Sequence, residues 1–557
     1  MRRACCLNGA CRGHNRHGHR SGHDASGGYI QIGKPNMTLE QKIGTMLMLG
    51  WEGDNPTDDT EVCAKNREIV QEMEVGGIIL MGRNVRHDDL AVTVNTINEL
   101  QALSREPLLV NVDQEGGMVA RFQDGVTVMP SAMTLGATRR PDLAYKACYA
   151  CAEELIALGV NYDFAPSVDV NNNPDNPIIG TRSCSESPDV VAEFGAQAIR
   201  GFQDAGVVAC AKHFPGHGDT AVDSHLALPS VPYPRERLEA MELKPFRAAI
   251  AAGVSSIMTT HIMFPALDPD LPSTLSRKII TGLLRGEMGY DGVIVTDSME
   301  MKGIADNWSV PEASVLAIEA GVDILLIPHK LETMRESREA VIKAVKDGRI
   351  PESRIDESVA RIMAMKRGYH LDERRFADPG TLAKSLRTPE HLAIQREIAD
   401  LGVTLVRDDS GAVPLGTEER VLVTGMHFTV PRLAAALSEH LPNVEALELS
   451  GERDEVLKQA VSAASGASAI VVATCPIEPW RQATDQALQA DVVKALSALG
   501  RKLIVVAVRD PYDLRKFPEV GAYVCTYGYR EGSLEAAAAL ISGAIEPRGT
   551  LPVTIPL

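Results

Sequence analysis

The chain has 557 residues, of which 45% are hydrophobic and 23% are charged, a balance typical of soluble globular proteins. A chain of this length normally divides into two or three domains. The net charge of −18 argues against a nucleic-acid-binding protein, and no run of eighteen apolar residues predicts a membrane span, so we expect neither partner.

The first segment, residues 1–36, is rich in Arg, His, Gly and Cys and nearly free of large apolar side chains. Its Arg pair is not followed by the apolar core of a secretory signal. We expect a disordered tail or an over-extended start, with Met37 as the working start; a metal site made of its Cys and His residues is the alternative. Without an export signal or a disulfide pattern, the sequence predicts a cytoplasmic protein.

Short apolar runs alternate with helix-like stretches such as 141–159, 187–206 and 236–253. This alternation predicts a closed (β/α)8 barrel, of the TIM type, over residues 37–371, with an open doubly wound sheet as the alternative. The eight apolar runs are 45–51, 76–81, 107–114, 161–170, 207–214, 255–264, 292–299 and 323–328.

A second α/β domain is predicted over residues 393–557, after a polar, proline-containing linker at 372–392. We expect a Rossmann-like α/β sandwich, but without GxGxxG or a phosphate-binding loop the sequence does not support a nucleotide site. Its expected strands are "VTLVRDD", "RVLVTGM", "AIVVATC", "KLIVVAVRDP" and "AYVCTYG".

Polar side chains stand at the ends of five of the eight barrel runs. The carboxyl ends of barrel strands are where active sites form, because the loops there converge over one mouth. One such residue is often only a helix cap, whereas five strand ends are better explained by a site. The residues are Asp113, Asp169, Lys212 with His213, His261 and Asp297.

The densest group of titratable residues lies in "AKHFPGHGDTAVDSHLALP", residues 211–229. Three interpretations are open: a metal site, a set of caps that hold a glycine-rich loop, and a site that binds a polar ligand and transfers protons. Lys212 places a cation inside the group, so we expect no metal and no other cofactor. The group comprises Lys212, His213, His217, Asp219, Asp223 and His225.

The third interpretation gives these residues distinct roles. Lys212 and His213 can donate hydrogen bonds to hydroxyl or carbonyl oxygens. Asp223, two residues before His225, can orient the imidazole and raise its pKa, which suits a general acid near neutral pH. Asp297 is then available as a nucleophile.

"KHFPGHGDTAVDSH" resembles glycoside hydrolase family 3, in its β-N-acetylglucosaminidase (β-hexosaminidase) branch. The segments "VNVDQEGGMVARF", "NYDFAPSVDVNNNP", "IIGTRS", "GYDGVIVTDSMEM", "EAGVDILLIP" and "GAIEPRGTLPVTIP" are similar to the other blocks of the family, in the same order. The resemblance runs from about residue 38 to the C-terminus.

This resemblance implies a role for each matching position. Asp297 matches the nucleophile, and His225 the general acid/base, with Asp223 as its dyad partner. Cys184 departs from the Phe that the family often has there, which leaves the packing of that loop open. The positions that match sugar-binding residues, with Arg121 in a supporting role, are Asp113, Arg121, Arg182, Lys212 and His213.

The activity so implied is the retaining, exo-acting hydrolysis of terminal β-linked GlcNAc from cell-wall fragments. The expected partner is therefore a carbohydrate, a GlcNAc-containing glycoside or a muropeptide. Phosphorolysis is an alternative on the same scaffold, because an imidazole acid/base repels an incoming phosphate less than a carboxylate does. β-Glucosidase or β-xylosidase activity, and a degenerate sugar-binding protein without activity, are further alternatives.

Overall fold

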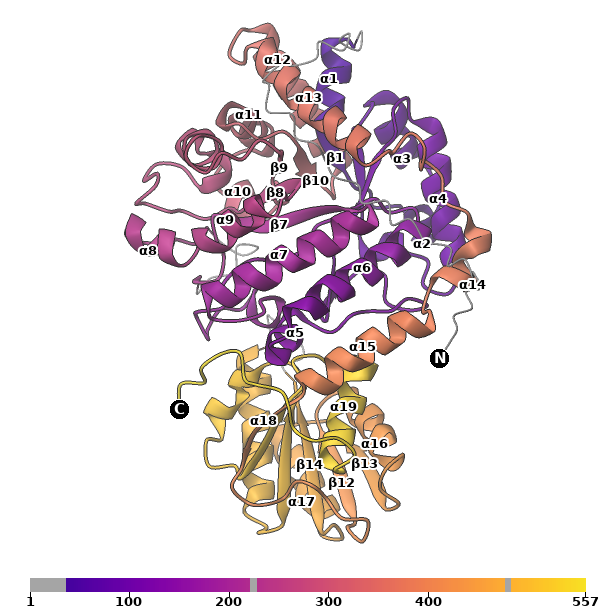
Figure 1. Cartoon of the computed structure of the whole chain (residues 1–557), viewed down its shortest axis with the longest axis vertical. Coiled ribbons are helices and arrows are strands. Elements are labelled where there is room, and N and C mark those ends of the chain that lie inside the picture. Colours follow the sequence, from indigo (N-terminus) through magenta and orange to yellow (C-terminus); the bar gives the residue numbers. More distant parts are fainter. Residues whose placement is uncertain (1–36, 221–227, 476–481) are drawn as a thin grey trace, which may run out of the picture. The chain divides into compact units, whose positions relative to one another are not determined.

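The computed structural model describes residues 37–220, 228–475 and 482–557, without the side chains of 482–486. Its first part is an eight-stranded parallel barrel, as the apolar runs predicted, and each of those runs contains one strand (Figure 1). The strands neighbour one another in the order β10-β1-β2-β3-β6-β7-β8-β9. They are β1 (Leu47–Leu49), β2 (Gly77–Leu80), β3 (Leu109–Val112), β6 (Tyr162–Asp163), β7 (Val208–Phe214), β8 (Ser256–Thr259), β9 (Val293–Val295) and β10 (Leu325–Ile327).

Backbone hydrogen bonds join the first and last strands of this order. The amide of Ile324, next to β10, donates to the carbonyl of Ile294 in β9 at 3.0 Å, and the amide of Thr296 donates to the carbonyl of Ile324 at 3.0 Å. A parallel bridge between Val295 and Ile324 accompanies them. The open doubly wound sheet, which was the alternative, is therefore wrong.

Helical segments connect the barrel strands. Those at 141–159 and 187–206 were predicted and are α6 (Pro141–Ala157) and α7 (Pro188–Ala205), both of which begin with proline, a residue suited to the first helical turn. The other α-helices of this part are α1 (Leu39–Thr45), α2 (Pro56–Thr60), α3 (Ala64–Arg67), α4 (Leu90–Leu103), α5 (Ala132–Thr138), α10 (Lys302–Ala305), α11 (Val310–Ala320), α12 (Leu331–Lys346) and α13 (Glu352–Gly368). The 3₁₀ and π segments are η1 (Glu68–Glu72), η2 (Gly82–Asn84), η3 (Gly180–Arg182), η4 (Ser273–Leu275) and η5 (Lys278–Glu287).

The single helix expected at 236–253 is instead two helices, α8 (Arg235–Ala240) and α9 (Leu243–Ala251). Pro245 explains the break. Its nitrogen carries no hydrogen and its ring clashes with the carbonyl four residues earlier, that of Met241, where the backbone leaves helical geometry (φ −117°, ψ −77°).

A two-stranded antiparallel hairpin, which the sequence did not indicate, follows β3. It consists of β4 (Gln114–Gly116) and β5 (Val119–Ala120). Two consecutive glycines with positive φ, Gly116 (87°) and Gly117 (56°), allow the chain to turn between the strands. The hairpin matters for the site because Glu115 is the middle residue of β4.

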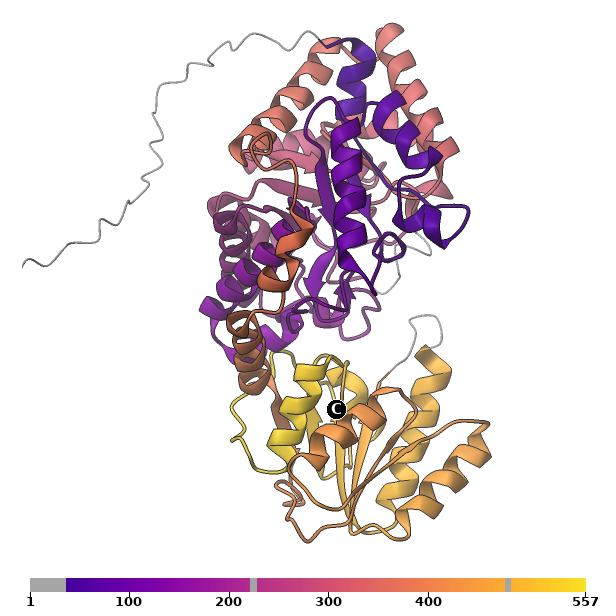
Figure 2. The ribbon, with the colours of Figure 1, turned by 90° about the vertical axis from the view of Figure 1, so that its right-hand side faces the viewer.

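The second part is built on a six-stranded sheet in the order β11-β16-β15-β14-β12-β13. Its inner strands were predicted as apolar runs because helices cover both faces: α16 and α19 pack on one, α17 and α18 on the other (Figure 2). Its strands are β11 (Thr404–Asp408), β12 (Val421–Gly425), β13 (Val444–Glu448), β14 (Ala469–Thr474), β15 (Lys502–Ala507) and β16 (Ala522–Cys525). Its helices are α16 (Thr429–Ser438), α17 (Arg453–Ala464), α18 (Gln482–Ser497), η7 (Pro511–Lys516) and α19 (Glu531–Ile541).

The sequence prediction missed β13. This strand lies at the edge of the sheet and reads "VEALE", and its side chains are exposed or half-buried, so it has no apolar run. The opposite edge strand, β11, pairs with β16 in the antiparallel sense, whereas the other pairs of this sheet are parallel.

The predicted linker segment, 372–392, contains η6 (Pro379–Thr381), α14 (Leu382–Ser385) and the start of α15 (Pro389–Gly402). Residues Leu39–Leu557 form one compact unit, so the predicted domain boundaries stay predictions. In the described part of the chain, no helix is both long enough and apolar enough to cross a lipid bilayer. The predictions for residues 1–36 lie outside the described residues.

Candidate active site

A cavity of about 550 Å³ opens at the carboxyl ends of the barrel strands. Its volume is in the range of small-molecule binding sites. The loop after β15 of the second part also contributes, through Arg509 and Asp510. Six residues predicted from the sequence line this cavity: Asp113, Arg121, Arg182, Lys212, His213 and Asp297.

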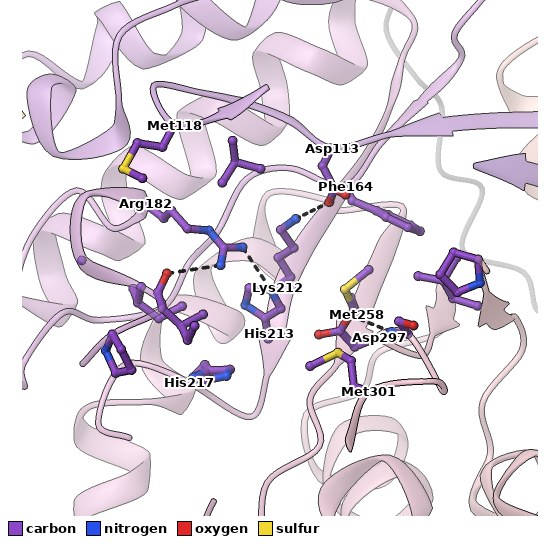
Figure 3. A pocket seen from close by; sticks show the side chains of 18 of the residues that line it. Asp113, Met118, Phe164, Arg182, Lys212, His213, His217, Met258, Asp297 and Met301 are labelled. Carbon is purple, nitrogen blue, oxygen red and sulfur yellow. Dashed lines mark hydrogen bonds and ion pairs between the residues drawn. The ribbon is translucent and has the colours of Figure 1, made fainter. Parts of the chain in front are cut away.

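Lys212, at the end of β7, is the centre of a charged network on one side of the cavity (Figure 3). Its side chain is only 2% exposed, and its Nζ lies 2.9 Å from Asp113 Oδ1 and 2.7 Å from Glu115 Oε1. The second oxygen of Asp113 accepts a hydrogen bond from Arg121 Nη2 at 3.0 Å. Asp113 therefore holds two cations in place, one on each oxygen.

Glu115 extends this network to Arg182. The guanidinium of Arg182 donates two hydrogen bonds to the carboxylate, from Nη2 to Oε1 at 2.7 Å and from Nε to Oε2 at 2.9 Å. This paired geometry fixes the plane of the guanidinium as well as its position. Sequence reasoning missed Glu115; the signal was its place two residues after Asp113, in "DQEGG".

The pKa values of the network follow from two opposing effects. Burial by itself raises the pKa of a carboxyl, but Lys212 and Arg121 outweigh it and hold the pKa of Asp113 well below its ordinary value. Burial is likewise outweighed at Glu115, where Arg182 and Lys212 lower the pKa to about 2. Burial lowers the pKa of Lys212, yet Asp113 and Glu115 raise it above normal. All these groups are therefore charged at neutral pH.

His213 is held between Arg182 and Asp169. Arg182 Nη2 lies 3.3 Å from His213 Nε2, and because a guanidinium can only donate, Nε2 is the acceptor. The proton of the neutral ring is then on Nδ1, which donates to Asp169 Oδ2 at 2.7 Å. In this arrangement His213 orients Arg182.

His217, in the same loop, also lines the cavity. Its backbone amide donates a hydrogen bond to Asp169 Oδ1 at 2.7 Å, so Asp169 joins this loop to the segment that follows β6. Burial lowers the pKa of His217 to about 4. The ring of His217 is thus neutral at physiological pH.

Asp297 lies two residues beyond β9, beside Met258 and Met301 (Figure 3). Its Oδ1 accepts a hydrogen bond from the amide of Ser298 at 2.7 Å. His261 supports the same segment, because its Nε2 lies 2.9 Å from the carbonyl oxygen of Ser298 and donates to it. The side chain of Asp297 is only partly buried and faces the cavity.

The predicted acid/base His225 and its partner Asp223 lie outside the described residues. Nearby, Asp219 is engaged elsewhere: it accepts hydrogen bonds from Asn172 Nδ2 at 2.9 Å and Arg237 Nη2 at 3.0 Å. Asp219 does not line the cavity, whereas His217 does.

Within the ranges that the structure describes, no group of three or more His, Cys, Asp or Glu side chains is arranged to hold a metal ion. Lys212 and Arg182 occupy the centre of the charged network, with positive charge where a metal site would need electron-pair donors.

Comparison with known proteins gives two family matches. Residues 38–365 match the glycosyl hydrolase family 3 N terminal domain, and residues 403–557 match the glycosyl hydrolase family 3 C-terminal domain. Among curated relatives, "Beta-hexosaminidase A" of Pseudoalteromonas piscicida is 32% identical, over 93% of this chain and 97% of its own. "Beta-N-acetylglucosaminidase/beta-glucosidase" of Cellulomonas fimi is 31% identical, over 94% and 95%.

A solved structure is also similar over nearly the whole chain. It is a glycoside hydrolase family 3 beta-N-acetylglucosaminidase from Paenibacillus sp. str. FPU-7, 39% identical, with a TM-score of 0.86. The alignment covers 93% of this chain and 99% of the other. The two family matches together span most of this chain, and with these relatives they show that it belongs to glycosyl hydrolase family 3.

Proposed function

We propose that this protein is a retaining, exo-acting β-N-acetylglucosaminidase that hydrolyses terminal β-linked GlcNAc. The names of its relatives support the activity, because they include β-hexosaminidases and a β-N-acetylglucosaminidase aligned over more than nine-tenths of the chain. The observation that carries the proposal is the cavity itself, in which the carboxylate of Asp297 shares one space with the charged network around Lys212.

The charged network suits the recognition of sugar hydroxyls. Asp113 has both oxygens engaged with cations, yet each oxygen retains lone-pair capacity to accept a hydroxyl proton. Lys212 and Arg182 carry further donors for hydroxyl or N-acetyl oxygens. Hydrogen bonds to charged groups contribute about 1.5–3 kcal/mol each, and the ion pairs fix these groups before the substrate arrives.

The proposed reaction proceeds in two steps at Asp297. Its carboxylate attacks the anomeric carbon, the glycosidic C–O bond breaks, and the departing oxygen takes a proton from the acid, for which we propose His225 oriented by Asp223. Water then attacks the glycosyl ester of Asp297 and transfers a proton to the neutral imidazole, which releases GlcNAc and restores both groups.

For the natural substrate we propose a GlcNAc-containing glycoside of bacterial cell-wall origin, a peptidoglycan fragment or muropeptide. This part of the proposal rests on the resemblance to the β-N-acetylglucosaminidase branch, whereas the cytoplasmic location stays a prediction from the sequence. Phosphorolysis differs only in the second step, with phosphate in place of water, so one assay series distinguishes the two.

The test is the release of nitrophenol from aryl β-glycosides. We expect turnover of the GlcNAc glycoside far above that of the glucoside and xyloside, and free GlcNAc as the product both with and without phosphate. Asp297→Ala should reduce kcat by several orders of magnitude and leave sugar binding largely intact. A slowly hydrolysed fluorinated glycoside should label the wild-type peptide that contains Asp297.

Asp306→Ala is the matched control, since Asp306 is an exposed aspartate nine residues further along the same connection. It should retain wild-type turnover. A covalent label on another carboxylate, such as Asp113, would show that Asp297 is not the nucleophile. Accumulation of GlcNAc 1-phosphate in phosphate buffer would favour the phosphorylase, and preference for the glucoside would overturn the GlcNAc assignment.

A further inference from the structure

A second, smaller cavity of about 290 Å³ adjoins the one that contains Asp297. It lies at the loops after β1 and β10, and Trp51, Glu52 and Lys330 are among its lining residues. One residue, His329, is among those that line both cavities. A ligand that extends from the first cavity into the second would therefore pass His329.

Arg83 fixes the proton position on the His329 ring. Arg83 Nη2 lies 3.2 Å from His329 Nδ1, and because a guanidinium only donates, Nδ1 must accept. Burial and the positive charge of Arg83 both lower the pKa of His329, so the ring stays neutral. Its single proton is then on Nε2, which makes Nε2–H a hydrogen-bond donor of fixed identity.

The position of this donor is fixed as well. Arg83 is held by the carbonyl oxygens of Trp51, at 3.1 Å from Nε, and of Pro328, at 3.3 Å from Nη2. The amides of His329 and Lys330 donate to the carboxylate of Glu300 at 2.7 and 2.9 Å. Glu300 is three residues after Asp297, so the loop that carries His329 is tied to the segment that carries the proposed nucleophile.

Nothing in the described parts of the chain accepts a hydrogen bond from Nε2 of His329. His329 is half-buried and is among the residues that line both cavities. A donor whose tautomer is fixed by Arg83, on a residue that lines two adjoining cavities, is suited to bind an acceptor oxygen of a ligand.

We propose that the second cavity holds the sugar residue on the leaving-group side of the scissile bond, and that His329 Nε2–H donates a hydrogen bond to a hydroxyl or carbonyl oxygen of that residue. This inference rests on the proposed glycosidase function and adds a specificity residue to it. His329 then favours sugar aglycones over aglycones that have no such oxygen.

The test compares two substrates: the β-1,4-linked GlcNAc disaccharide and phenyl β-GlcNAc, whose aglycone has no hydroxyl or carbonyl. A neutral hydrogen bond contributes about 1–1.5 kcal/mol, so His329→Phe should lower kcat/KM for the disaccharide about tenfold, mainly through KM. The value for the phenyl glycoside should change less than about twofold. His329→Gln, which retains an N–H donor, should recover most of the loss.

A binding measurement removes catalysis from the comparison. In the Asp297→Ala background, His329→Phe should weaken disaccharide binding about tenfold and leave the affinity for GlcNAc alone unchanged. His440→Phe, at an exposed histidine of the second part, is the matched control and should behave as wild type.

Equal losses on both substrates would overturn the inference, since His329 would then act on the GlcNAc in the first cavity or on loop packing. An unchanged disaccharide value would overturn it too. Failure of the proposed function is a different result, in which the wild type releases no GlcNAc from either substrate.

Discussion

Glu115 provides the sharpest test of the charged network, because its carboxylate is shared by two buried cations. Glu115→Gln keeps the size of the side chain and removes the charge. The amide has one oxygen where the carboxylate had two, so its NH2 group must face Arg182 or Lys212, and both are donors. The variant therefore loses two ion pairs, and its NH2 group faces N–H donors where the carboxylate had an acceptor oxygen.

The magnitude follows from the pKa of Glu115, which falls from 4.5 to about 2 in the folded protein. At 1.36 kcal/mol per pKa unit, the folded state gains about 3 kcal/mol from the ionised carboxylate. Removal of one partner from a buried ion pair costs about 3–5 kcal/mol, in agreement with this value. Because the folded pKa lies below the unfolded one, the stabilisation is complete above pH 4.5 and is lost as the pH falls toward about 2.

The assay is urea unfolding of the wild type and Glu115→Gln at pH 7 and at the lowest pH where both unfold cooperatively. We expect the variant to be less stable by about 3 kcal/mol at pH 7, with a smaller difference at the lower pH. KM for the GlcNAc glycoside should also rise, because Arg182 loses its paired bonds.

Glu312→Gln is the matched control. Glu312 also binds one guanidinium through both oxygens, that of Arg349 at 2.7 and 3.0 Å, but its side chain is 47% exposed. A surface pair of this kind contributes less than about 1 kcal/mol. If Glu115→Gln and Glu312→Gln had equally small effects, the account of Glu115 as the anchor of two buried cations would be refuted.

Two further predictions concern a buried lysine and His225, the residue proposed as the acid/base. Lys366 is 3% exposed and donates a hydrogen bond to the carbonyl of Gly76 at 2.8 Å. Burial lowers its pKa from 10.5 to about 7. Between pH 7 and 10.5 the unfolded state therefore binds a proton that the folded state does not, so the stability of the wild type should rise with pH. Lys366→Met should be more stable than the wild type at neutral pH, by up to about 4–5 kcal/mol. Denaturant titrations at several pH values should show that the stability of the variant lacks this rise. If the difference in unfolding free energy between wild type and variant did not change with pH, the burial argument would be contradicted. His225→Ala should slow cleavage of GlcNAc disaccharides far more than glycosyl-enzyme formation from a dinitrophenyl glycoside, with azide rescue of the second step, and Asp223→Ala should show a weaker form. The same loss on both substrates without rescue would make His225 a binding or packing residue, and His217 would become the first candidate for the acid.

Much of the fold could be read from local sequence, because a strand covered on both faces must be apolar along its whole length. The eight barrel strands and the inner strands of the second sheet lie in largely apolar runs, which polar residues such as Lys212 and His213 in β7 interrupt. β13 does not, since one edge of a sheet needs no continuous apolar run, and "VEALE" resembles a surface segment. The helix break before Pro245 was missed, although the missing amide of proline is a local signal for it.

The residues of the site were readable as chemical types at strand ends, but their partners were not. Lys212 and Asp113 are 99 residues apart in the chain, and Arg182 and Glu115 are 67 apart, so only the closed barrel brings them within hydrogen-bond distance. Glu115 was overlooked because the hairpin that directs it inward depends on the turn at Gly116 and Gly117.

The tertiary structure alone decided which groups carry charge and where each proton lies. The sequence shows only that residue 329 is a histidine. Which of its ring nitrogens carries the proton follows from the contact with Arg83, 246 residues away in the chain. Likewise the cavity includes Arg509 and Asp510 from the second part of the chain, which no pattern near the barrel motifs indicated. Local sequence determines secondary structure through periodicity and burial, but the protonation and orientation of a site depend on distances between groups that only the folded chain sets.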